Sequence, residues 1–113
     1  MEHSNYTVLL FAVIGVLFVL LGIPLKQGAV PPNWWYGFRT KKTLSDKEIW
    51  YAVNRVTGID MIRVGVVLVA ASLIVFALRN WLSPESSVAV LIVVMLLMVG
   101  YMAFHGLSIL RRM

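Results

Sequence analysis

Three long apolar runs restrict what this chain can fold into more than any other feature of its sequence. The first covers residues 6–25 without a charge, the second covers 59–78, and the third covers 88–110. At about 1.5 Å per residue, twenty helical residues span roughly 30 Å, the thickness of the hydrocarbon core of a bilayer. The charges of the second run, Asp60 and Arg63, lie near its start. We therefore predict an all-α integral membrane protein with three transmembrane helices.

The composition supports a single membrane domain over residues 1–113. Hydrophobic residues make up 60% of the chain and the mean hydropathy is +0.86, which exceeds what a soluble domain of this size can bury. The first run is longer than the apolar core of a secretory signal peptide, and it follows Glu2 instead of a basic segment. We interpret it as a span and not as a cleaved signal.

The basic residues of the short loops predict the orientation. None lies in residues 1–5, six lie between the first and second runs, only Arg79 lies between the second and third, and Arg111 and Arg112 follow the third. Because cytoplasmic loops are enriched in Lys and Arg, we predict an amino terminus outside and a carboxyl terminus in the cytoplasm of a multi-pass plasma-membrane protein. The net charge of +5 favours anionic lipid headgroups as partners, and no nucleic acid is expected.

The sequence offers little for catalysis. It has no cysteine, no paired carboxylates within a run and no glycine loop of the kind that holds phosphate. His105 has no second histidine on its side of the membrane, and Asp60 and Arg63 are spaced to neutralise each other as a structural ion pair. We expect no enzyme, no cofactor and no metal site.

The cytoplasmic loop, residues 26–58, contains the uncommon residues. Pro31 and Pro32 prevent a helix, and the aromatic residues 34–36 are typical of the membrane interface. Ser45 and Glu48 have the spacing of a capping box, and Gly58 can end a helix. We predict a short amphipathic helix over residues 46–57 that lies at the interface, with Trp50 toward lipid or the bundle.

One series of loop residues has a recognisable order. It consists of Gly37, Phe38, Arg39, Thr40, Thr43, Leu44, Trp50, Asn54 and Arg55, and an apolar run follows it. This motif resembles the signature of the SdpI family, bacterial membrane proteins named for an immunity protein. The resemblance covers about the middle third of the chain. It implies a plasma-membrane protein that protects its producer from a secreted toxic peptide, with these nine residues as the binding motif. A signalling role through a regulatory protein is a further implication.

The individual motif residues leave alternatives open. Arg39 can bind a phosphate or carboxylate with two parallel hydrogen bonds, or it can anchor lipid or pair with Glu48 or Asp60. Thr40 and Thr43 can donate to the same anion or bond their own backbone in a turn. Asn54 and Arg55 can complete the binding loop or cap the end of the predicted helix.

Two other functions and one assembly also fit the sequence. The chain could be a small oligomeric transport or lipid-handling protein, or an accessory subunit of a membrane complex. Small residues at Gly100, Ala103 and Gly106 give the third run a smooth surface, which favours close helix packing. That surface predicts either a homodimer or a contact within the chain.

Overall fold

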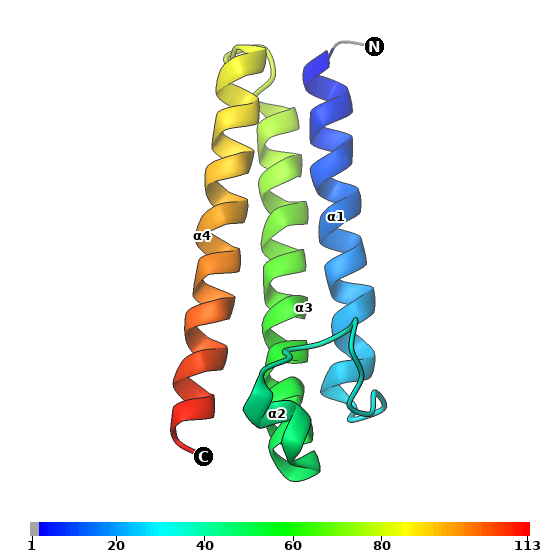
Figure 1. Cartoon of the computed structure of the whole chain (residues 1–113). Coiled ribbons are helices and arrows are strands. Elements are labelled where there is room, and N and C mark those ends of the chain that lie inside the picture. Colours follow the sequence, from blue (N-terminus) through cyan, green and yellow to red (C-terminus); the bar gives the residue numbers. More distant parts are fainter. Residues whose placement is uncertain (1–2) are drawn as a thin grey trace.

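The computed structural model describes residues 3–113 and contains three long helices and one short helix (Figure 1). The long helices are α1 (His3–Lys26), α3 (Lys47–Ala77) and α4 (Pro84–Arg111), and the short helix is α2 (Lys41–Ser45). All three long helices are long and apolar enough to cross a membrane. The predicted all-α class, with three candidate spans and a short helix between the first and second, is confirmed.

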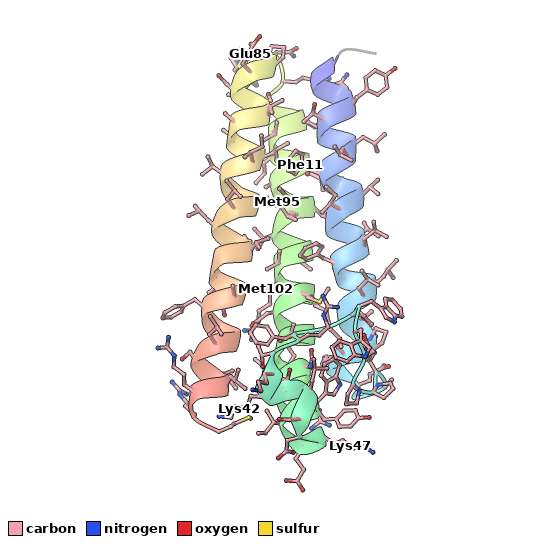
Figure 2. The ribbon with its side chains drawn as sticks, in the orientation of Figure 1. Phe11, Lys42, Lys47, Glu85, Met95 and Met102 are labelled. Carbon is pink, nitrogen blue, oxygen red and sulfur yellow. The ribbon has the colours of Figure 1, made fainter. Side chains whose placement is uncertain are left out.

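Consecutive long helices run in opposite directions and form an elongated bundle of 51 × 23 × 19 Å (Figure 1). The end of α1, helix α2, the start of α3 and the end of α4 therefore meet at one end of the bundle, called here the loop end. Figure 2 shows Lys42 and Lys47 at the loop end and Glu85 at the opposite end. Most of the Lys and Arg residues lie in the segments that meet at the loop end.

The short helix lies earlier in the chain than predicted. Residues 46–57 form the first turns of α3, which continues through Gly58 without a break. Asp46, not Ser45, is the N-cap, and its side chain accepts hydrogen bonds from the backbone N–H groups of Glu48 and Ile49. The prediction of a separate interfacial helix over these residues was wrong, because Gly58 packs against α1 instead of ending a helix.

Two glycine pairs bring α1 and α3 into direct backbone contact. A Cβ atom on Gly65 would lie 2.4 Å from the carbonyl oxygen of Gly15, and one on Gly58 would lie 2.5 Å from that of Gly22. The partners in each helix are seven residues apart, two turns of a helix, so both pairs lie along one seam. Lipid tails are as apolar as the side chains of these helices, so close packing of the backbones is a main source of helix association in a bilayer.

Helix α4 is packed more loosely than the α1–α3 pair. The apolar core includes Phe11 of α1 and Leu68 of α3, with Met95 and Met102 of α4 packed against it (Figure 2). Only Ser87, Leu91, Gly106 and Leu110 of α4 are buried. The last two lie at the loop end, where the segment between α1 and α3 covers α4.

Candidate functional site

The segment after α1 folds back along that helix before it reaches α3. Asn33 fixes this turn, since its Oδ1 accepts hydrogen bonds from the backbone N–H groups of Trp35 at 3.0 Å and Tyr36 at 2.7 Å. The Tyr36 hydroxyl donates a hydrogen bond to the carbonyl oxygen of Leu21. Burial raises the pKa of Tyr36 above its usual value, because it penalises the charged phenolate. The segment is therefore tied to α1 one turn before that helix ends.

Gly37 allows the chain to approach α3 closely. Its φ is +110°, a conformation that side chains with a Cβ atom rarely adopt. A Cβ atom here would also lie 2.7 Å from Asn54 Oδ1 and 3.2 Å from the Trp50 ring. Only glycine fits both the backbone conformation and the space.

Asn54 holds the next residue, Phe38, through both of its backbone polar groups. The Phe38 N–H donates to Asn54 Oδ1 at 2.5 Å, and Asn54 Nδ2 donates to the Phe38 carbonyl oxygen at 3.3 Å and to that of Trp50 at 3.0 Å. The Asn54 residue is only 2% exposed. The predicted capping role was wrong, because Asn54 lies within α3 and satisfies the loop backbone instead.

Thr40 and Thr43 form a reciprocal capping box at the start of α2. The Thr43 N–H donates to Thr40 Oγ1 at 3.1 Å, and the Thr40 N–H donates to Thr43 Oγ1 at 2.8 Å. The Thr43 hydroxyl also lies 3.1 Å from the Phe38 carbonyl oxygen, to which it can donate. Of the two predicted alternatives, the structure has the turn role.

Trp50 is fully buried and fixes the start of the loop to α3. Its indole Nε1 donates to the carbonyl oxygen of Val30 at 2.9 Å. The alternative in which Trp50 faces the bundle and not lipid is therefore the correct one.

The loop also reaches α4. A Cβ atom on Gly106 would lie 2.6 Å from the Phe38 ring, so this ring packs directly on the backbone of α4. Lys42 Nζ donates to the carbonyl oxygen of Leu110 at 3.0 Å, near the end of the same helix. The motif segment thus joins α3 to α4, and the Phe38 ring of the same chain covers Gly106.

Comparison with known families gives a match over residues 29–105 to the model of the SdpI/YfhL protein family. The match covers more than half of the chain and includes the motif segment, α2, α3 and most of α4. The chain belongs to the SdpI/YfhL family. Searches of curated proteins and of solved structures found no significant match.

The motif that resembled the SdpI/YfhL signature divides into two groups in space. Gly37, Phe38, Thr40, Thr43, Trp50 and Asn54 form the contact network just described, called here the loop seat. Leu44 is half-buried beside it, whereas Arg39 and Arg55 are exposed. Within residues 5–113, the Arg39 guanidinium has neither an ion-pair nor a hydrogen-bond partner, so the predicted pairing with Glu48 or Asp60 is absent.

One contact in this SdpI/YfhL chain was missed by sequence reasoning. The predicted ion pair is present, with Arg63 3.7 Å from Asp60 Oδ1, but Asp60 Oδ2 of α3 also lies 2.5 Å from His105 Nδ1 of α4. Antiparallel spans place the start of the second beside the end of the third, but only the helix register decides that these two side chains meet. Asp60 therefore lies beside two basic side chains, those of Arg63 and His105.

Proposed function

We propose that this SdpI/YfhL protein protects its producer against a membrane-active peptide by binding that peptide at the loop end. The observation that carries the proposal is the contrast between Arg39 and its surroundings. The residues on both sides of Arg39 are held by hydrogen bonds, while its own guanidinium is exposed and unpaired within the described residues. Because the backbone that carries this cation is already ordered, binding an anion restricts the Arg39 side chain but does not have to order the loop.

The chemistry of Arg39 indicates the kind of group it would bind. A guanidinium donates two parallel hydrogen bonds to a carboxylate or a phosphate. A peptide that inserts across the bilayer presents its C-terminal carboxylate or an acidic side chain at the interface. Such a carboxylate is the ligand group that we assign to Arg39.

The basic loop end supports a cytoplasmic location for the binding event. Lys26, Lys41, Lys42, Lys47, Arg111 and Arg112 lie there with Arg39 and Arg55, against Arg79 near the opposite end. Under the positive-inside bias this end faces the cytoplasm. Exposed Trp34 and Trp35 fit an interfacial position beside anionic headgroups. In this proposal the ligand is bound on the cytoplasmic side of the plasma membrane.

A survival assay tests the proposal. Sensitive bacteria that express the chain, its Arg39→Ala variant or its Arg79→Ala variant are challenged with a panel of membrane-active peptides. Arg79 is the matched control because it is also exposed but lies at the opposite end of the bundle. We expect the parent chain and Arg79→Ala to protect and Arg39→Ala to fail at equal expression. Equal survival with and without the chain for every peptide would contradict the immunity role.

A further inference from the structure

A contact between two ionisable side chains, Asp60 and His105, joins α3 to α4. Asp60 is 1% exposed, and its Oδ2 contacts His105 Nδ1, whereas the His105 side chain is 32% exposed. The other carboxylate oxygen, Oδ1, is buried and has no hydrogen-bond donor among the described residues. A buried anion with an open acceptor is costly in apolar surroundings, so ionisable groups inside a span are candidates for function.

The pair can exist in three charge states. In the state with the fewest protons, an anionic carboxylate lies beside a neutral imidazole. With one proton added, the pair is either a carboxylate beside an imidazolium or a carboxylic acid beside a neutral imidazole. With two protons it is a carboxylic acid beside an imidazolium. Only the state with one proton combines opposite charges or removes both. Gain or loss of a proton from that state changes the net charge of the pair, and with it the strength of the contact between α3 and α4.

Few other charges surround the pair. From α3, Arg63 lies 3.7 Å from Asp60 Oδ1, but its side chain is 63% exposed. From α4, the titratable neighbour is Tyr101, whose ring stacks on His105 with a centroid distance of 5.5 Å. Helix α1 has no charged residue between Asn5 and Leu25, and the loop brings the uncharged Phe38 beside Gly106. Arg63 therefore also compensates the charge of Asp60, although exposure of its side chain to solvent weakens this contribution.

The pair lies next to the loop seat. Gly106 follows His105 directly and supports the Phe38 ring, and the Phe38 backbone is held in turn by Asn54. Because few residues of α4 are buried, its polar contacts with Asp60 and Lys42 contribute to fixing this helix. A weaker contact between Asp60 and His105 would loosen the surface on which Phe38 rests.

We infer that Asp60 and His105 form a shared proton-binding site, and that proton binding there changes how firmly α4 supports the motif loop. The site is separate from Arg39 and needs no peptide ligand. Its tests therefore use no toxin and succeed or fail independently of the immunity role.

Histidine NMR tests the proton site directly. The chain has two histidines, so a His3→Gln variant leaves only the signals of His105. The full-length variant, with labelled histidine, is placed in nanodiscs of zwitterionic lipid and titrated between about pH 5 and pH 8. We expect reversible changes in the imidazole signals, and a different titration curve after Asp60→Asn. Signals that do not change, or superimposable curves for the two variants, would overturn the shared site.

A second experiment tests the link to the loop. Since the chain has no cysteine, spin labels can be attached to Lys41→Cys and Arg111→Cys, two exposed positions on α2 and α4. We expect the spin–spin coupling to change between about pH 8 and pH 5, and this change to be lost in His105→Gln, which can donate to Asp60 but does not titrate. Ser108→Ala on the same helix is the control and should keep the response. A full response in His105→Gln would overturn the link. Should that variant fail to fold, the same comparison is made with Asp60→Asn.

Discussion

Asn54 of α3 satisfies both the backbone N–H and the carbonyl group of Phe38, sixteen residues earlier in the chain. This contact seats the loop on the helix, and Gly37 makes it sterically accessible. The neighbouring hydrogen bonds of Thr43 and Trp50 secure the segment on either side of it. The motif residues that surround Arg39 therefore have a structural role, because they hold the loop against α3.

Replacing Asn54 with leucine should release the loop seat. Leucine has a similar volume but leaves the Phe38 N–H without its acceptor, which costs about 1–3 kcal/mol when the group stays buried. We expect a lower thermal unfolding midpoint in detergent and faster proteolysis within residues 30–44. Asn80→Leu is the control, since Asn80 is exposed near the opposite end. Equal stability of the two variants would show that the Asn54 contacts contribute nothing to the fold.

The glycine seam should tolerate no side chain. In Gly65→Ala, the new Cβ atom would meet the backbone of Gly15, so α1 and α3 must move apart, and overpacking of this kind typically costs about 1–3 kcal/mol. Thermal unfolding measures the loss. Gly100→Ala is the matched control because nothing lies within 4 Å of that position. A Gly65→Ala variant as stable as Gly100→Ala would contradict the seam.

The predicted homodimer through α4 now depends on Gly100 and Ala103. Gly106 is covered by Phe38, so Gly106→Leu should cause misfolding whatever the oligomeric state. Gly100 is open, so Gly100→Leu should preserve the fold and convert a dimer into monomers. Light scattering in detergent and crosslinking in membranes distinguish the two states. Dimers that persist in Gly100→Leu would remove this surface as the interface.

The spans were predictable because hydropathy and length are sufficient to identify a membrane helix. The predicted separate helix over residues 46–57 was wrong because local capping signals do not report contacts with other helices. Gly22 of α1 lies against Gly58, and α3 continues through this position. The same limit applies to the contacts between distant segments of the site. The turn of Thr40 and Thr43 was among the alternatives because these residues are only three apart in the sequence. The contacts of Asn54 with Phe38 and of Asp60 with His105 depend on helix register, which a single sequence does not reveal.

The orientation predicts which loops a reagent can reach. In this cysteine-free chain, a cysteine at Ser45 should resist an impermeant thiol reagent in intact cells, and one at Ser86 should react. Both positions are exposed, so a difference reports the side of the membrane and not burial. Both cysteines should react after the cells are permeabilised. Labelling of Ser45→Cys in intact cells, with Ser86→Cys silent, would reverse the topology.

In the proposed site, the guanidinium of Arg39 binds the ligand through its geometry and not only through its charge. The most direct measurement is the minimum inhibitory concentration of an active peptide for cells that express the parent chain, Arg39→Lys or Arg39→Ala at equal levels. Lysine keeps the charge but lacks the planar pair of donors. We predict that Arg39→Lys protects almost as poorly as Arg39→Ala. Full protection by Arg39→Lys would contradict this role of the guanidinium, because charge alone would then be sufficient.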